Sequence, residues 1–287
     1  MAVLASALFS AKAEEITKTF YFGDIKSLDI EYCYMVHVTK GNSNAVKVEY
    51  DSVIRDYMDI QYDSNTCCLE MKMDKKTPKT LFKTGRLPRI DIYLEMDDIN
   101  KLDINGAASV TFEGEYKGNG VEIEVSGASK IKSLNIKGES LSFTCSGASN
   151  GTIEGDFSGD VDITLSGASR MSCTCNCKEI DAQISGASRL TLEGNYNDVD
   201  VACSGASSAQ MEGSAKTAEF ECSGASRIEA KDFITKDLRA DLSGASWAEV
   251  HATSNLVYTI SRACKIIYHG DAFLKNLTAE PNVIKGR

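Results

Sequence analysis

Hydrophobic and polar residues alternate along most of this chain. Before each copy of a recurring Ser-Gly-Ala-Ser motif, the residues six, four and two positions ahead of the glycine are nearly all apolar, as in Val161, Ile163 and Leu165. The residues between them are mostly polar, and a period of two is typical of a β-strand with one buried face. Apolar residues return four and six positions after the glycine, as in Leu190 and Leu192. The pattern therefore predicts a strand on either side of the motif and a looser return to the next copy.

The motif recurs at a nearly constant period. Its central glycines, spaced 19 to 21 residues apart, are Gly106, Gly127, Gly147, Gly167, Gly186, Gly205, Gly224 and Gly244. A degenerate copy, Ser261 to Cys264, follows them. A propeller blade or a helical repeat pair needs a longer period, whereas about 20 residues suit one coil of a parallel β-helix. We therefore predict an all-β fold, a single-stranded parallel β-helix (β-solenoid) with coils of about 20 residues.

The residue types of the motif predict how the corner is turned. Glycine adopts positive φ without a Cβ penalty, so it can redirect the chain between two strands. We expect the small alanine to point into the corner. We expect the two serines to hydrogen-bond local backbone or the equivalent serine one coil away. Stacked coils lie about 4.8 Å apart, so equivalent residues should form columns along the rod.

The chain divides into three segments. Residues 1–13 are short and apolar and end in an A-x-A pattern at Ala11 to Ala13, which predicts a signal peptide lacking its basic start; a disordered tail is the alternative. Residues 14–100 alternate without the motif, so we interpret them as N-terminal strands, a cap and the first irregular coils; a separate small β-domain is the alternative. Residues 101–287 hold the Ser-Gly-Ala-Ser β-helix and its C-terminal cap, in one solenoid with the preceding segment.

Composition narrows the function classes. The chain has 287 residues, 43% of them hydrophobic, which is enough for a sizeable core. Its formal net charge is -10, whereas nucleic-acid binding favours a basic face, so we expect no nucleic-acid partner. No apolar run approaches the roughly 20 residues of a membrane-spanning helix, so we expect no integral membrane segment in the mature chain. The three histidines, His37, His251 and His269, lie far apart, so we expect no histidine-rich metal site and no cofactor.

Ten cysteines raise the question of disulfides and metals. Three of them stand two positions before the glycine, where other copies carry valine, leucine or isoleucine, so we interpret them as small core residues: Cys145, Cys203 and Cys222. Cys173, Cys175 and Cys177 alternate with polar residues and should share one strand face. Their spacing is not the C-x-x-C of a zinc knuckle, so we predict no metal site, with a thiolate metal site as the alternative.

A column of basic residues is the main candidate for a binding surface. The residue three positions after the glycine should repeat along one edge of the rod: Lys130, Asn150, Arg170, Arg189, Ser208, Arg227, Trp247 and Lys265. An acidic column stands five positions before the glycine: Glu122, Asp162, Asp181, Asp200 and Glu219. One interpretation is that such charges keep stacked strands soluble and in register. The other is that the six basic and aromatic residues bind an acidic polymer such as a glycan, with Trp247 stacking on a sugar ring.

Catalytic motifs are absent from the sequence. Enzymes that cleave polysaccharides on a β-helix need paired carboxylates, or a cluster of lysine, arginine or metal, in a cleft. Coils of about 20 residues leave no insertions from which to build one. The sequence contains no Ser/His/Asp set, P-loop or H-E-x-x-H motif. We therefore predict that the chain is not an enzyme.

The repeat and its flanks resemble one family. Leu102 to Ala108, the repeated Ser-Gly-Ala-Ser with Val or Leu before it in several copies, and Ile266 to Asp271 resemble the head GIN domain of putative auto-transporter adhesins, across about residues 18–278. The resemblance implies a β-solenoid in an exported bacterial envelope protein and brings no catalytic residues. We therefore predict a non-catalytic, adhesin-like binding module in the periplasm, at the outer membrane or on the cell surface of a Gram-negative bacterium, with a glycan or another envelope component as partner. A periplasmic scaffold without a specific ligand is the alternative, and a polysaccharide-active enzyme comes third.

Overall fold

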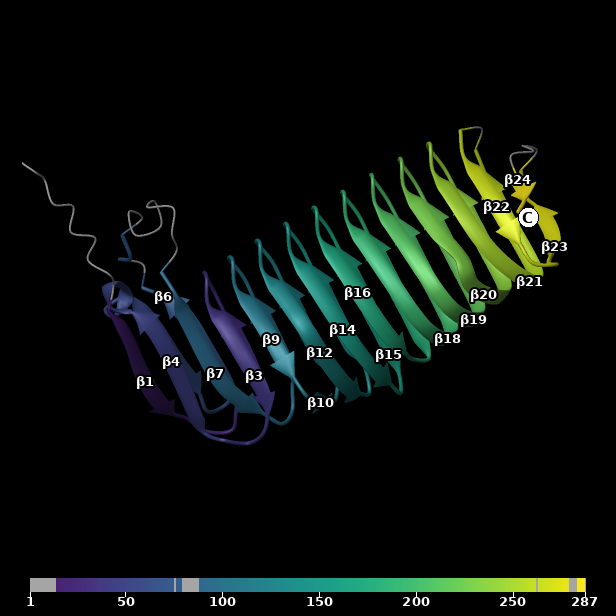
Figure 1. Ribbon diagram of the computed structural model, residues 1–287. Helices are drawn as coiled ribbons and strands as arrows, with labels where there is room; N and C mark the ends of the chain where they lie inside the picture. The colour runs from purple at the N-terminus through teal and green to yellow at the C-terminus, as the bar shows by residue number, and fades with distance from the viewer. Residues whose placement is uncertain (1–13, 75, 79–87, 262, 279–282, 287) are drawn as a thin grey trace, which may run out of the picture.

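The computed structural model describes residues 14–74, 76–78, 88–261, 263–278 and 283–286. The expected signal peptide, residues 1–13, lies outside these ranges. The described residues form a β-solenoid of about 9 turns, with 24 strands and one 3-10 helix at Ser52–Ile54. Figure 1 shows the strands stacked into an elongated rod, with β1 (Glu15–Tyr21) at one end and β24 (Val283–Lys285) at the other. The predicted all-β solenoid is therefore confirmed.

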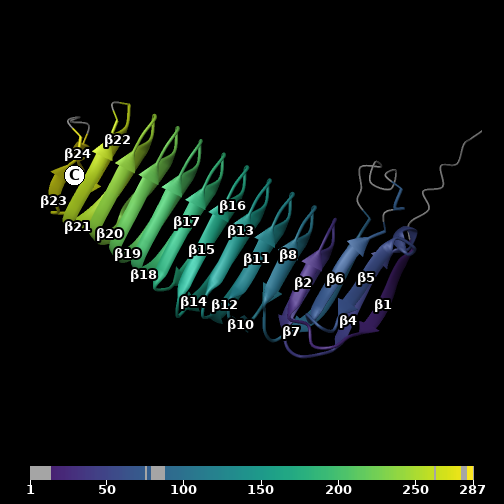
Figure 2. The same ribbon diagram turned by 180° about the vertical axis from the view of Figure 1, so that it is seen from behind.

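The coils contribute strands to two rows. In spatial order, the row before the corner, in front in Figure 2, consists of β5 (Met58–Asp63), β6 (Cys68–Met73), β2 (Ser27–Ile30), β8 (Lys101–Ile104), β11 (Val121–Val125), β13 (Leu141–Cys145), β15 (Asp160–Leu165) and β17 (Glu179–Ile184). The row after the corner consists of β1, β4 (Ala45–Asp51), β7 (Ile90–Met96), β3 (Met35–Lys40), β9 (Ser109–Glu113), β12 (Lys130–Gly138), β14 (Asn150–Phe157) and β16 (Arg170–Asn176).

Four long strands join the two rows at the return bend. They are β18 (Arg189–Cys203), β19 (Ser208–Cys222), β20 (Arg227–Leu242) and β21 (Trp247–Ile260). Three strands then close the C-terminal end: β22 (Lys265–His269), β23 (Phe273–Asn276) and β24. The short β10 (Glu115–Gly118) lies beside the second half of β12. No helix in the described part of the chain is long and apolar enough to cross a membrane.

Parallel pairing places equivalent residues opposite one another. In β13 and β15, for example, Phe143 pairs with Ile163 and Cys145 with Leu165. These side chains are at most 1% exposed, and the alternate positions face solvent. Burying one such side chain stabilises the fold by about 1.5–3 kcal/mol. The buried face of each coil meets those of its neighbours in one continuous core, which is the expected consequence of the period-two pattern.

The eight corner glycines all adopt positive φ, between 71° and 85°. A second constraint comes from stacking, because a Cβ on Gly186 would lie 2.5 Å from the carbonyl oxygen of Gly167 in the preceding coil. That same carbonyl oxygen accepts a hydrogen bond of 2.7 Å from the backbone N–H of Ala187. Glycine is therefore required both for the left-handed conformation and for the close approach of successive corners.

The expected direction of the corner alanine is wrong. Ala187 is exposed, whereas Ser188 is 1% exposed and points inward. The reason is that the period of two resumes straight after the glycine, so the second serine takes the core position. Its hydroxyl accepts a hydrogen bond of 3.2 Å from Ser169 Oγ, which confirms the expected contact between equivalent serines at this step. Most other corner serines donate to a backbone carbonyl, as Ser226 does to Cys203 at 3.1 Å.

The N-terminal strands stack in an order that differs from their order in sequence. The coil formed by β2 and β3 lies between the β6–β7 coil and the β8–β9 coil. At the outer end, β1 and β4 pair antiparallel with each other, β4 with β7, and β5 with β6. In the β2–β3 coil, Tyr32 takes the place of the corner glycine, with φ of 70°. The backbone N–H of Ala107 donates to its carbonyl oxygen at 2.6 Å.

Candidate functional site

The structure brings the residues of the basic column into one line. They pair in sequence from strand to strand: Lys130, Asn150, Arg170, Arg189, Ser208, Arg227, Trp247 and Lys265. Each is the first residue of its strand, immediately after the buried serine or, for Lys265, after Cys264. Alternation then turns these side chains outward, and all five basic members are exposed.

Positive charge is concentrated at Arg170 and Arg189. These residues are direct partners in the pairing of β16 and β18, so their backbones lie about 4.8 Å apart. Among the described residues neither guanidinium forms an ion pair, and the contact that Arg189 makes is a hydrogen bond from Nε to Ser208 Oγ at 3.4 Å. The adjacent outward positions are the neutral Ser172 and Thr191. The two arginines therefore present their charge to solvent.

Unlike Arg170 and Arg189, Arg227 is held by contacts with neighbouring side chains. The Arg227 guanidinium lies 5.0 Å from the centre of the Trp247 ring, a cation–π contact. Its Nη1 also donates to Glu229 Oε1 at 3.0 Å. Sequence analysis missed the role of Glu229, although its spacing of two residues from Arg227 signals that both share one strand face.

A shallow groove opens between Arg189 and Arg227. It has a volume of about 390 Å³, and its lining includes Ser208, Gln210 and Glu229. The groove exists because the short Ser208 stands between two long arginines, beside the small Ala206 at the corner. Arg189, Arg227 and Ser208 offer donors suited to a carboxylate or sulfate group, and the Glu229 carboxylate in the same lining already pairs with Arg227.

The acidic column lies on the opposite row of strands. Asp162, Asp181 and Asp200 pair in β15, β17 and the second half of β18, and Glu219 follows in β19. The row with β14 and β16 is in front in Figure 1, whereas the row with β15 and β17 is in front in Figure 2, where the rod is seen from the other side. The hydrophobic core separates the two columns, so the acidic column does not neutralise the basic one.

Six of the ten cysteines are buried in the core, and the described structure contains no disulfide. Cys145, Cys203 and Cys222 are at most 2% exposed, as expected for small core residues. Cys173 and Cys175 are equally buried, with 3.5 Å between their sulfur atoms. The hydrogen bond from the Cys173 thiol lowers the pKa of the Cys175 thiol. The hydrogen bond with Cys175, together with burial, raises the pKa of Cys173.

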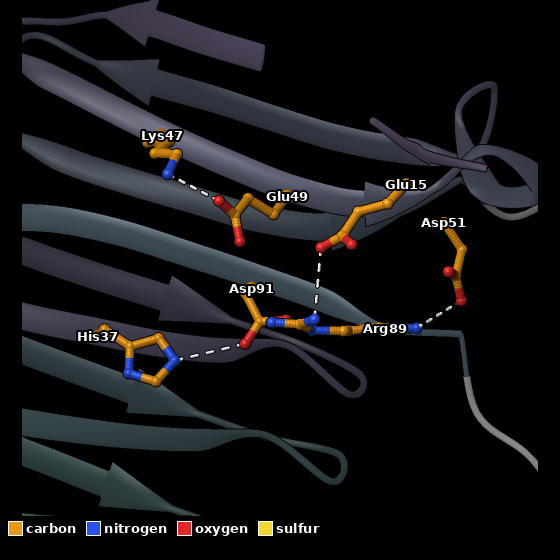
Figure 3. A network of polar contacts seen from close by, with 7 residues as sticks. All are labelled: Glu15, His37, Lys47, Glu49, Asp51, Arg89 and Asp91. Atoms are coloured by element: carbon orange, nitrogen blue, oxygen red, sulfur yellow. Dashed lines mark hydrogen bonds and ion pairs between the residues drawn. The ribbon is translucent and has the colours of Figure 1, made fainter. Parts of the chain in front are cut away.

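Two other polar clusters consist of ion pairs and hydrogen bonds. Near the N-terminal end, Arg89 joins the buried Asp91 through Nε at 2.5 Å and Glu15 at 3.3 Å, and its backbone N–H donates to Asp51 (Figure 3). His37 lies 3.4 Å from the same Asp91 carboxylate. These ion pairs and hydrogen bonds link β7 to the neighbouring strands. None of the residues drawn in Figure 3 is a serine, threonine or cysteine that could act as a nucleophile.

The second cluster is a group of carboxylates. Glu219, Glu221 and Asp241 have oxygen atoms within 4.8 Å of one another. Arg239 offsets part of this charge, with 3.0 Å to Glu219 and 2.7 Å to Asp241. Two of the three carboxylates are therefore held in ion pairs with one arginine.

Comparison with known proteins agrees with this geometry. The family model described as "Putative auto-transporter adhesin, head GIN domain" matches residues 26–173 and 161–272. A crystal structure of a putative adhesin from Parabacteroides distasonis is similar, with 16% identity, a TM-score of 0.51, and coverage of 95% of this chain and 97% of that one. A putative adhesin from Parabacteroides merdae is 15% identical, with a TM-score of 0.52 and coverage of 95% and 93%.

No curated protein shows significant sequence similarity to the chain. The solved relatives are too distant in sequence to show more than the shared fold. The family matches, by contrast, overlap and together span most of the chain, including both rows of strands and the basic column. The chain therefore belongs to the head GIN domain family of putative auto-transporter adhesins.

Proposed function

We propose that this protein is a non-catalytic, exported binding module of the bacterial envelope that holds an acidic glycan along its basic column. The observation that carries the proposal is the groove of about 390 Å³ between Arg189 and Arg227, with Ser208 in its lining. Membership of an adhesin family supports a role in binding surface components. The ligand would lie in the periplasm, at the outer membrane or on the surface of a Gram-negative cell.

The chemistry of the groove favours an acidic sugar over a neutral one. A guanidinium binds a carboxylate through two parallel hydrogen bonds, and such charge-assisted bonds are stronger than neutral ones. The Arg227 guanidinium covers one face of the Trp247 ring, and an apolar sugar face would stack on the other. A linear polymer could then contact Arg170, Arg189 and Arg227 at once, so that several weak contacts add.

A scaffold role remains the alternative. It is favoured by the hydrogen-bonded stacking of every coil, which needs no ligand, and by the shallowness of the groove. Under this alternative, the arginines only keep the strands soluble and prevent edge-to-edge association. The two functions differ in one measurable property, because only the first requires that the arginines contact a ligand.

The experiment is a screen of immobilised acidic and neutral glycans with the wild-type protein and a triple variant, Arg170→Ser, Arg189→Ser and Arg227→Ser. A control variant, Lys101→Ser, Lys137→Ser and Arg239→Ser, loses the same charge away from the basic column, at residues that pair with Glu122, Glu115 and Glu219. We expect binding of acidic glycans by the wild type and the control, and loss of binding in the triple variant. Absence of any preference for acidic glycans, or equal binding by all three proteins, would leave the scaffold role.

A further inference from the structure

Three thiols line the inside of the return bend in one coil. Cys173 and Cys175 are 1% and 2% exposed, and their sulfur atoms lie 3.5 Å apart. Cys177 is partly buried, and its thiol donates to the carbonyl oxygen of Glu179 at 3.2 Å. The adjacent coils fill the same place differently: Gly155 pairs with Cys175, and the buried Phe157 follows two residues later. The next coil carries Gly194 and Tyr196 there. Thiols therefore replace a glycine and an aromatic ring.

A buried hydroxyl closes the space above these thiols. Tyr196 is 6% exposed, and its hydroxyl has no hydrogen-bond partner among the described residues. A Cβ on Gly194 would lie 2.7 Å from this hydroxyl and 1.7 Å from the carbonyl oxygen of Cys175, which places the hydroxyl beside the coil of the thiols. An unpartnered buried polar group costs about 1–3 kcal/mol. Such a group points to a site that is completed by something else.

An acidic groove leads to the same bend. It has a volume of about 620 Å³, and Cys175 and Asn176 form part of its wall. Glu154, Asp156 and Glu193 also line it, so its charge attracts cations and repels anions. Asn176 donates to Asp156 at 2.8 Å, which holds one of these carboxylates beside the strand of the thiols. The groove therefore concentrates cations on the outer face of the bend, on the other side of the strand from the buried thiols of Cys173 and Cys175.

The donor set selects the class of cation. Thiolates are soft ligands and favour Cu(I), zinc or iron–sulfur clusters over calcium or magnesium. Structural zinc and iron–sulfur sites take four protein ligands, usually cysteine or histidine. The bend supplies three sulfur atoms and a phenol, and the three histidines lie elsewhere in the chain. Three sulfur atoms are sufficient for Cu(I), which is stable with two or three soft ligands.

We propose that Cys173, Cys175 and Cys177 form a binding site for a soft monovalent cation of the Cu(I) class. Binding replaces thiol protons by the metal, and the released protons pass to solvent, so no electrons are transferred and the metal keeps its oxidation state. Cys177 leaves its contact with the Glu179 carbonyl and turns toward the other two sulfur atoms. The partly buried Cys177 is the most accessible of the three thiols, and the site is independent of the glycan proposal.

The test uses the full chain, reduced and handled without oxygen. Cu(I) is offered in complex with a chromophoric chelator, and loss of the chelator's colour measures transfer to the protein. We expect one equivalent per chain for the wild type. X-ray absorption should show copper surrounded by sulfur at about 2.2–2.3 Å, close to the distances of other metal–thiolate bonds.

Matched variants separate this site from the other cysteines. The variant with Cys173→Ala and Cys175→Ala should lose uptake. The control with Cys203→Ala and Cys222→Ala removes another buried pair, in register between β18 and β19, and should retain it. Because the first variant removes core atoms, the single Cys177→Ala, at a partly buried position, provides a second test and should weaken copper binding at least about tenfold. Equal uptake by all variants, equal loss in both double variants, or equal competition by Zn(II) would overturn the proposal.

Discussion

Arg170 and Arg189 face each other directly in the parallel pairing of β16 and β18, and no carboxylate within the described residues pairs with either guanidinium. Like charges in direct opposition destabilise a strand pair, so a sheet selected only for stability would separate or neutralise them. Elsewhere in the chain an arginine is neutralised: Arg239, on the other row, pairs with Glu219 and Asp241. The contrast is the physical basis for assigning a ligand to the basic column.

The acidic row leads to a prediction about pH and stability. Glu179 lies between Asp160 and Asp198 in the strand pairing, and burial together with the charges of Asp160, Asp200 and their neighbours raises its pKa. A raised pKa in the folded state means that stability is greatest below the ordinary glutamate pKa of about 4.3 and is lost as pH rises through the folded value. We therefore expect Glu179→Gln to raise the melting temperature at neutral pH and low salt, with the gain vanishing below about pH 4.

The matched control stands in the acidic column itself. Glu122 pairs with Lys101 at 3.0 Å, so Glu122→Gln removes an attraction instead of a repulsion. Its melting temperature should stay equal or fall under the same conditions. A gain of the same size in both variants would show that total charge, not the local column, determines the effect.

The corner predicts a difference between two neighbouring residues. Gly186→Val places a branched side chain at φ of 71° and against the carbonyl of Gly167. Backbone strain alone costs about 1–3 kcal/mol, so the variant should lose more than this from its free energy of unfolding. Ser188→Ala removes one buried hydroxyl contact and should cost about 1 kcal/mol. Urea unfolding of both variants measures the two values. Equal costs would mean that the chain does not turn at the glycine.

The network in Figure 3 predicts that a buried carboxylate stabilises the N-terminal end. Asp91 is 4% exposed and contacts both Arg89 and His37, so Asp91→Asn should lower the free energy of unfolding by about 1–3 kcal/mol. Glu49→Gln, which breaks only a surface pair with Lys47, should cost less than about 1 kcal/mol. The two variants are compared by thermal unfolding, and a larger loss for Glu49→Gln would contradict the assignment.

The repeat region could be predicted because its signals are local. Period two assigns Val161, Ile163 and Leu165 to the core, and a constant spacing sets the register that brings Arg170 opposite Arg189. The orientation of Ala187 and Ser188 was not predictable from residue size, because the resumed alternation decides it. The ion pair between Arg227 and Glu229 depends on rotamers that the pattern does not specify.

The N-terminal end was predictable only in outline. Its strands alternate as expected, but the placement of β2 and β3 inside the stack depends on long-range pairing that has no signal in the local sequence. Tyr32 at a corner position hides the motif there, since a non-glycine residue occupies the left-handed conformation. The alternation likewise predicts that Cys173 and Cys175 share one strand face, but it does not predict the 3.5 Å between their sulfur atoms.

The most direct test of the basic column is the salt dependence of glycan binding. The affinity of the wild type for an acidic oligosaccharide, measured by calorimetry at about 50 mM and about 500 mM salt, should fall steeply because exposed charges are screened over a few ångströms at high salt. The variant with Arg170, Arg189 and Arg227 changed to serine should bind at least about tenfold more weakly at low salt, a loss of about 1.4 kcal/mol. The control with Lys101, Lys137 and Arg239 changed to serine should behave as the wild type. An affinity that is independent of salt, or equal in both triple variants, would contradict the proposed function.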